Sequence, residues 1–249
     1  MAASAQTPGS FCITVLRTAD PARAAAFYGA LFDWTAEDLP GAPTYLLMQC
    51  QGRTVASVHR DTTGSEIWVP HVAVDDLQQT QAEAVGLGAD VVTQGDVAGL
   101  ARLSTCRDQE GALFGLWQPA PHRGAELIEE VGSLWWVELL SNDAPAAAAR
   151  YGRLFGWTPR QTSFHPFDSY TVLERGTRQE GGVLPIGPDW EVTPRWNSIF
   201  AVADCDAACA QAEALGGCVI FVHTVPSAGR IAVLTDPGGA AFVLRGPVP

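Results

Sequence analysis

Short hydrophobic runs alternate with amphipathic segments along this chain, and their order recurs. The run 11–16, FCITVL, is rich in β-branched residues and predicts a strand. Asp20 followed by Pro21 predicts the start of a helix, because Asp caps free backbone amides and Pro fits the first turn. Phe27 and Leu31 are four residues apart and predict an apolar face on that helix.

The same order restarts near residue 67. The run 67–74 predicts a strand, and Asp76 predicts the cap of a helix that ends near Gly88. Each half of the chain is therefore predicted to contain the order strand, helix, three strands, twice. The strands expected after the helices of the first half are 44–49, 54–59, 90–94, 100–106 and 113–117.

The two halves of the chain repeat each other. Gly9–Trp34 and Gly132–Trp157 are identical at twelve of 26 aligned positions. The later segments 196–217 and 229–244 match 68–89 and 101–116 at an offset of 128 instead of 123, which places a five-residue insertion inside the second half. The repeat predicts a first domain at 1–119, a linker at 120–131 and a second domain at 132–249.

Composition and charge narrow the range of functions. The 249 residues carry a net charge of −12, which argues against a nucleic-acid surface and against adhesion to anionic membranes. The negative charge is explained by solubility alone, and attraction of a cationic ligand is the alternative explanation. No run of 18 apolar residues occurs, residues 1–12 lack a signal-peptide pattern, and the six cysteines form no Cys-x-x-Cys pair. We therefore expect a cytoplasmic protein with free thiols.

Two segments carry a family resemblance. Asp20–Trp34 and Asp143–Trp157 closely match the pattern D-x-x-A-A-x-F-Y-x-x-L-F-G-W, and 236–244, DPGGAAFVL, is similar to the family's closing strand. The chain thus resembles the vicinal oxygen chelate superfamily of glyoxalases, extradiol dioxygenases and bleomycin resistance proteins, especially its tandem actinobacterial members. The resemblance implies an α+β fold of two tandem domains, each a pair of βαβββ modules that form a cup-shaped sheet.

The resemblance also implies where metal ligands would lie. The corresponding positions are Ile13, Val69 and Gly115 in the first half and Trp136, Asn197 and Val243 in the second. A catalytic divalent metal needs about three or four His, carboxylate or Cys ligands, and neither set supplies two. We therefore predict no metal and no cofactor, while a ligand set from other positions stays open.

Alternation along strands selects the candidate site residues. If Trp136 faces into the second cup, then so does Glu138, and His71 shares a face with Val69. His223 lies in a segment that approaches the cup mouth in the family. The predicted ligand-binding residues are Ile13, Val69, His71, Trp136, Glu138, Asn197 and His223. The alternatives are a structural Glu138 paired with Arg195 or Arg230, and a hydrogen-bonded core role for His71.

Three functions are consistent with these residues. The favoured one is a metal-independent protein that binds an apolar or aromatic metabolite, such as an anthracycline, for sequestration or as an accessory to a tailoring enzyme. The first alternative is a metal-independent isomerase, cyclase or hydroxylase-like enzyme in which Glu138 or His71 acts as general base. The second alternative is a metal-dependent glyoxalase or dioxygenase. A small molecule and a tailoring enzyme are the expected partners, and either a monomer or a homodimer fits.

Overall fold

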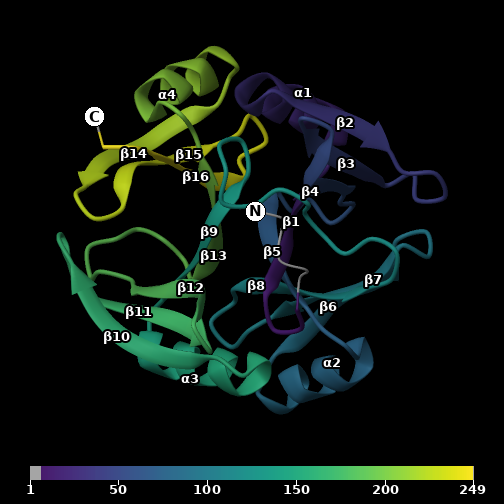
Figure 1. The fold of residues 1–249 in the computed structure, drawn as a ribbon, viewed down its shortest axis with the longest axis horizontal. Helices are drawn as coiled ribbons and strands as arrows, with labels where there is room; N and C mark the ends of the chain where they lie inside the picture. The colour runs from purple at the N-terminus through teal and green to yellow at the C-terminus, as the bar shows by residue number, and fades with distance from the viewer. Residues whose placement is uncertain (1–6, 249) are drawn as a thin grey trace.

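The computed structural model describes residues 7–248, so residues 1–6 of the predicted first domain and residue 249 of the second lie outside it. Its strands form two eight-stranded sheets, one from each half of the chain (Figure 1). The strands are β1 Phe11–Thr18, β2 Trp34–Asp38, β3 Tyr45–Cys50, β4 Arg53–Arg60, β5 Ile67–Ala73, β6 Asp90–Asp96, β7 Ala101–Arg107, β8 Leu113–Pro119, β9 Leu134–Ser141, β10 Thr158–Phe164, β11 Phe167–Arg175, β12 Arg178–Pro185, β13 Arg195–Ala201, β14 Cys218–Val225, β15 Gly229–Thr235 and β16 Ala241–Gly246.

The strand order confirms the predicted fold. It runs β2-β3-β4-β1-β5-β8-β7-β6 in the first sheet and β10-β11-β12-β9-β13-β16-β15-β14 in the second. Two modules meet in each sheet where β1 pairs antiparallel with β5, and where β9 pairs antiparallel with β13. The molecule is thus an α+β protein of two tandem, cup-shaped sheets.

Four helices cover the outer faces of the sheets: α1 Pro21–Phe32, α2 Leu77–Gly86, α3 Ala144–Phe155 and α4 Cys205–Ala214. Asp20 caps α1 as predicted, and Asp143, its counterpart in the repeat, caps α3; each accepts a bond from a first-turn amide. α3 ends at Gly156 in the left-handed conformation, with a φ of 72°, which glycine adopts without steric cost. None of the described helices is long and apolar enough to cross a membrane.

The edge strands β2 and β10 are not among the strands expected from the sequence. Only Trp34 is buried in β2, so this strand shows no alternation that could reveal it. Its counterpart β10 is paired with β11, and together these two strands hold five more residues than β2 and β3. The loop between β10 and β11 is shorter than the loop between β2 and β3, so the offset between the halves rises only from 123 at Trp34 and Trp157 to 125 at the ends of β3 and β11. The five-residue insertion predicted in the second half is therefore divided, with two residues in the β10–β11 hairpin and three in the connection 186–194 between β12 and β13.

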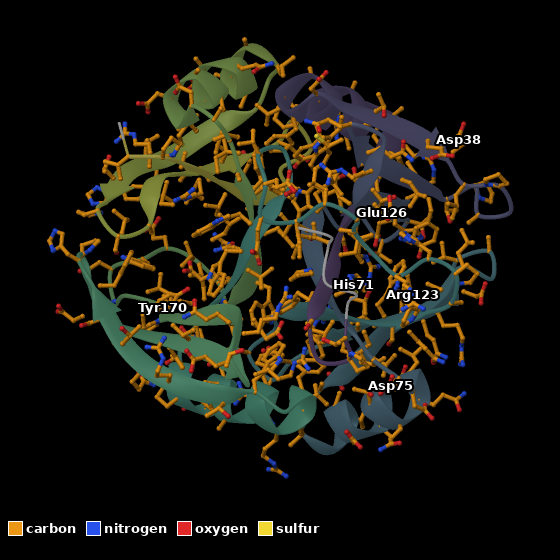
Figure 2. All side chains as sticks on the ribbon, in the orientation of Figure 1. Asp38, His71, Asp75, Arg123, Glu126 and Tyr170 are labelled. Carbon is orange, nitrogen blue, oxygen red and sulfur yellow. The ribbon has the colours of Figure 1, made fainter. Side chains whose placement is uncertain are left out.

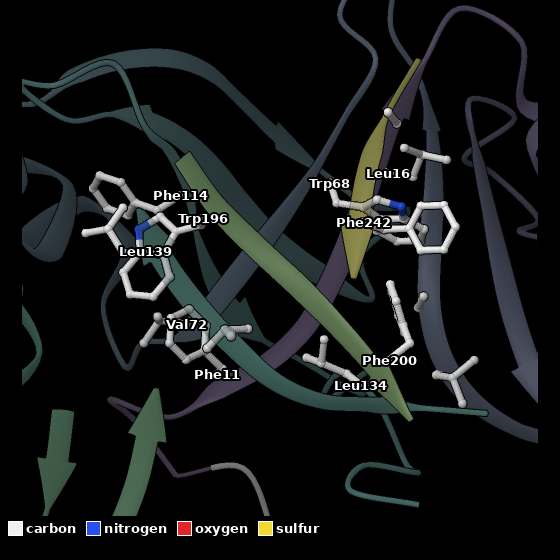
Figure 3. Packing of buried hydrophobic residues seen from close by; sticks show 14 of the residues in the cluster. Phe11, Leu16, Trp68, Val72, Phe114, Leu134, Leu139, Trp196, Phe200 and Phe242 are labelled. Carbon is white, nitrogen blue, oxygen red and sulfur yellow. The ribbon is translucent and has the colours of Figure 1, made fainter. Parts of the chain in front are cut away.

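The two halves share one hydrophobic core, because helices of one half pack beside helices of the other. Figure 1 shows α1 next to α4 and α2 next to α3, and both pairs are in contact. Figure 3 shows Phe114 of the first half beside Trp196 of the second, and Trp68 of the first half beside Phe242 of the second. Each sheet therefore buries its outer face partly against the other half.

Two equivalent hydrogen-bond chains cross between the halves inside this core. The Tyr28 hydroxyl accepts a bond from Trp68 Nε1 at 2.8 Å and donates to Asp236 Oδ2 at 3.0 Å. In the equivalent series of hydrogen bonds, the Tyr151 hydroxyl accepts from Trp196 Nε1 at 3.0 Å and donates to Asp108 Oδ2 at 2.9 Å. Each tyrosine thus joins a tryptophan of its own half to an aspartate of the other half.

The indole groups after α1 and α3 add a second reciprocal contact. Trp34 Nε1 donates to the carbonyl of Gly132 at 2.7 Å, and Trp157 Nε1 donates to the carbonyl of Gly9 at 2.6 Å. These glycines begin the repeated segment in each half. The end of each first helix is therefore bonded to the start of the opposite half.

Removal of the Tyr28 hydroxyl tests this coupling. Tyr28→Phe leaves the Trp68 indole N–H and the Asp236 carboxylate without their buried partner, so we expect a loss of about 1–3 kcal/mol in the free energy of unfolding, measured in urea. Tyr151→Phe is expected to cost a similar amount. Tyr45→Phe is the control, because no hydrogen bond among residues 7–248 uses the Tyr45 hydroxyl. An equal effect of all three substitutions would contradict the assignment.

Candidate functional site

The face of each sheet that points away from the helices is called its inner face. On the first sheet it carries Ile13 opposite His71 and Val15 opposite Val69. On the second sheet it carries Trp136 opposite Ile199 and Glu138 opposite Asn197. The shared face expected from strand alternation is therefore present in both halves, and the two inner faces can be compared position by position.

The first inner face is filled by its own side chains. Ile13 and Val69 have no exposed surface, and His71 is 1% exposed. Trp117 packs edge-on against the His71 ring with 6.1 Å between centroids. Gly115 lies opposite His71, and a β-carbon at Gly115 would overlap the imidazole. The imidazole therefore occupies the space above the glycine, and a ligand would have to displace it.

His71 is uncharged at neutral pH. Burial lowers the pKa of its imidazole to about 4. Nδ1 lies 2.9 Å from the carbonyl oxygen of Val69, which can only accept, so the proton sits on Nδ1. Nε2 is then an acceptor, and no group in the described part of the chain donates to it. This environment resembles the core histidine considered above more than an accessible general base.

The charged residues of the first inner face neutralise one another. Arg17 Nε donates to Asp61 Oδ2 at 2.7 Å, and Arg17 Nη1 donates to Thr93 at 3.2 Å. The Arg17 and Asp61 side chains are 5% and 1% exposed. Hydrogen bonds from Thr63 and Arg17 to the Asp61 carboxylate hold its pKa low, at about 2, against the opposing effect of burial. No charge on this pair is left for a ligand.

The segment that follows β8 crosses the first sheet. His122 donates its amide to Leu100, and Glu126 donates its amide to Thr54 on β4. Figure 2 shows Arg123 and Glu126 on this segment, between the strands β3–β4 and the strand β7. The Trp117 indole also donates to the His122 carbonyl at 3.3 Å. The predicted linker thus packs on the first half instead of forming a free tether.

The second inner face carries an apolar row that runs across five strands. Successive pairs join Trp136 to Ile199, Ile199 to Val243, Val243 to Val233, and Val233 to Phe221. Phe221 is 53% exposed, and Trp136 and Val233 are partly exposed, while Ile199 and Val243 between them are buried. Five strands about 4.8 Å apart give the row a length of about 19 Å. The equivalent row of the first half contains Ile13, His71, Gly115, Thr105 and Thr93.

Glu138 is held by two aromatic residues at one end of this row. Trp136 Nε1 donates to the Tyr170 hydroxyl at 2.9 Å, and that hydroxyl donates to the Glu138 carboxyl. Figure 2 shows Tyr170 on the sheet of the second half. Gly182 makes room for the phenol, because a β-carbon there would overlap the hydroxyl. The carboxyl is therefore oriented by a chain of three side chains.

The Glu138 carboxyl titrates near neutrality. Burial raises its pKa from 4.5 to about 7, and the hydrogen bond from Tyr170 opposes this increase only in part. The residue still keeps some contact with solvent. No described basic side chain lies within 4.0 Å of the carboxyl, so the alternative of a pairing with Arg195 or Arg230 is not observed. A carboxyl with such a pKa can exchange a proton at neutral pH.

Asn197 and Arg195 lie on β13 next to Glu138. Arg195 Nε donates to Asn197 Oδ1 at 3.0 Å, and Asn197 is 6% exposed. Because that oxygen accepts from Arg195, the amide nitrogen of Asn197 is oriented as a donor. Arg230 lies elsewhere and pairs with Asp206 at 2.9 Å.

His223 lies on the outermost strand of the second sheet, opposite Ile231. It is half-buried, and its ring stacks on Phe221 with 5.9 Å between centroids. His223 therefore lies four strands from Trp136, at the far end of the inner face. Of the seven predicted site residues, the structure brings together Trp136, Glu138 and Asn197, places His223 at the opposite edge, and buries Ile13, Val69 and His71 in the first half.

Sequence reasoning missed three residues of the second inner face. Tyr170 and Phe221 lie on strands whose register depends on an irregularity in the β10–β11 hairpin and on a bulge between Val219 and Phe221. Arg195 was considered only as an ion-pair partner of Glu138. The available signal was the repeat itself, because Arg195 and Phe221 replace Ile67 and Thr93 at the 128-residue offset.

The tandem modules and capped helices define a vicinal oxygen chelate protein. Residues 13–117 match the family model of the glyoxalase-like domain. The chain is 36% identical over 245 residues to "Putative glyoxylase CFP32" of Mycobacterium tuberculosis, covering 94% of this chain and 93% of that protein. It is 34% identical over 254 residues to the anthracycline biosynthesis protein DnrV of Streptomyces peucetius, covering 94% and 92%. The chain therefore belongs to the glyoxalase-like family of this superfamily.

Solved structures share the fold at low sequence identity. The Mn(II)-bound glyoxalase from Novosphingobium aromaticivorans matches with a TM-score of 0.63 and 14% identity, covering 95% of this chain and 82% of that one. Homoprotocatechuate 2,3-dioxygenase from Brevibacterium fuscum matches with a TM-score of 0.63 and 12% identity, covering 98% and 82%.

The inner faces do not fit a metal ion such as the Mn(II) of the glyoxalase neighbour. The positions that the resemblance assigns to ligands hold Ile13, Val69 and Gly115 in one half, and Trp136, Asn197 and Val243 in the other. Among residues 7–248, no three His, Cys, Asp or Glu side chains gather closely enough to hold a metal ion. The Glu138 carboxyl is bonded to Tyr170 and belongs to no such group among the described residues.

Glu138→Gln tests the titration of this carboxyl. Its pKa is higher in the folded than in the unfolded chain, so folded wild-type protein loses stability as pH rises from about 4.5 to about 7. The variant lacks this loss. We expect the free energy of unfolding of Glu138→Gln to gain roughly 1–3 kcal/mol over wild type between pH 5 and pH 8. Urea denaturation at each pH measures it. The exposed Glu191→Gln is the control, and parallel curves for all three proteins would disprove the shift.

Proposed function

We propose that the second inner face binds a flat, apolar or aromatic metabolite without a metal. The apolar row from Trp136 to Phe221 forms the surface for the rings, and Glu138 with Asn197 supplies polar contacts at one end. Ligand sites typically combine an apolar lining with a few well-placed polar groups. The observation that carries the proposal is a difference in exposure between the two halves, because Trp136, Val233 and Phe221 keep exposed surface, while the equivalent Ile13 and Thr105 of the first half, and His71 between them, are buried.

The relatives support an aromatic ligand. DnrV of Streptomyces peucetius and DauV of Streptomyces sp. strain C5 are both anthracycline biosynthesis proteins, and each aligns with 94% of this chain. Anthracyclines are flat, fused-ring molecules that suit a row of partly exposed aromatic and aliphatic side chains. We therefore propose an aromatic polyketide as the ligand, bound for sequestration or for delivery to a tailoring enzyme.

Titration with 1,8-dihydroxyanthraquinone tests the binding function. In the presence of EDTA, we expect saturable binding with one site per chain, followed by visible absorbance. Trp136→Leu is expected to raise Kd about 10-fold, because it removes the aromatic surface at the polar end of the row. Ile13→Val at the matched position of the first half should leave Kd unchanged. Two equal sites, or binding that Trp136→Leu does not weaken, would overturn the assignment to the second inner face.

The near-neutral pKa of Glu138 favours a second candidate function, which is proton transfer. The carboxylate would remove a proton from a carbon beside a carbonyl of the bound molecule, and the resulting acid would return it elsewhere. The bond from Tyr170 fixes the carboxyl for this step. Isomerisation of an aromatic ketone needs only this proton movement. In an aldol-type cyclisation, the enolate carbon also bonds to a second carbonyl carbon, and the oxygen of that carbonyl takes the returned proton.

Exchange of hydrogen for deuterium in 2-tetralone tests proton transfer. In D₂O with EDTA, wild-type protein is expected to accelerate exchange beside the carbonyl, with a rate that rises through about pH 7 as Glu138 ionises. Glu138→Gln should lower the rate at least about 100-fold while Kd changes less than about twofold. Mass spectrometry follows the exchange. An unchanged rate in Glu138→Gln would leave binding as the remaining function.

A further inference from the structure

Arg195 is a cation on the second inner face that lacks a counter-charge. It is half-buried, and its Nε donates to the neutral Asn197 amide. No carboxylate of residues 7–248 lies within 4.0 Å of its guanidinium. Its neighbour across the strand pair is Leu140. Burial lowers the pKa of Arg195, as expected for a guanidinium that has lost water without gaining a carboxylate.

The first half shows how the same fold neutralises an arginine on its inner face. Arg17 is paired through Nε and Nη2 with Asp61, and its Nη1 donates to Thr93. No equivalent of Arg195 exists in the first half, where the matched position is Ile67. A half-buried charge without a partner is costly, and a ligand with the opposite charge would offset that cost. The unpaired guanidinium therefore points to an anionic group on the ligand.

We propose that the ligand of the second inner face is a planar aromatic acid whose carboxylate binds Arg195 and Asn197. This inference rests on the proposed binding function and adds the chemical class of the ligand. The inference also predicts the sign of the charge on the ligand, because an amino group would lie beside the same guanidinium and be repelled.

The atoms available on β13 fit a carboxylate. Arg195 uses Nε for Asn197, which leaves the two terminal nitrogens to donate side by side to two carboxylate oxygens. The amide nitrogen of Asn197 is a further donor, because its oxygen already accepts from Arg195. Glu138 lies opposite Asn197 and can donate to the same oxygens when it carries its proton. The ring attached to the carboxylate would then extend from Trp136 along the apolar row.

A matched pair of probes tests the charge of the ligand. Anthraquinone-2-carboxylate and anthraquinone-2-carboxamide have the same rings and differ in the charge of one substituent. At pH 6, where most of Glu138 is protonated, we expect wild-type protein to bind the carboxylate about 10-fold more tightly than the amide in calorimetric titrations. Arg195→Gln should abolish this preference by weakening only the carboxylate. Arg195→Lys, which keeps the charge without the paired geometry, should retain part of it.

The control is Arg230→Gln, which removes an arginine of the same half that pairs with Asp206 away from the inner face. It should leave both dissociation constants unchanged. Unaltered binding of the amide to Arg195→Gln also shows that this variant is folded. Equal binding of the two probes to wild type, or a preference that survives in Arg195→Gln, would overturn the acid assignment and leave the proposed function intact. Binding of neither probe would overturn both.

Discussion

The structure depends on the buried hydrogen bonds that each tyrosine of the two first helices makes across the molecule. Tyr28 and Tyr151 each join a tryptophan of one half to an aspartate of the other. A tyrosine hydroxyl can be buried only if it has partners, and here those partners come from both halves. The outer faces of the two sheets therefore pack into one common core. A substitution on the outer face of one half also affects the packing of the other half.

The inner faces are free of this constraint, and it is there that the two copies differ. In the first half, His71 fills the space above Gly115, Asp61 neutralises Arg17, and the segment around Glu126 packs across the sheet. In the second half, the matched positions hold a partly exposed apolar row beside Glu138, and Arg195 bonds to Asn197 without a carboxylate partner. One copy has become a packed core, while the other retains exposed aromatic and polar groups.

A metal site would require other residues on the inner faces than the ones this protein has there. The structural neighbours include a Mn(II)-bound glyoxalase and dioxygenases, yet both inner faces carry apolar or amide side chains at the expected ligand positions. The inner face of the second half presents a carboxyl oriented by Tyr170 and Trp136, and a guanidinium beside Asn197. Recognition of a ligand through such groups relies on hydrogen bonds and charge in a partly dry environment, where both are stronger than in water.

The sequence by itself determined the tandem modules, the helix caps at Asp20 and Asp143, and the shared face of Trp136 and Glu138. These features follow from local hydrogen bonding, strand alternation and the repeat. Only the tertiary structure decided that β2 and β10 are strands, that Tyr170 reaches Glu138 across Gly182, and that Arg195 bonds to Asn197 without meeting a carboxylate. It also decided that His71 is buried and Trp136 partly exposed. The physical reason is that pKa values, ion pairs and exposure depend on which strands are neighbours, and neighbours distant in sequence are set by sheet register.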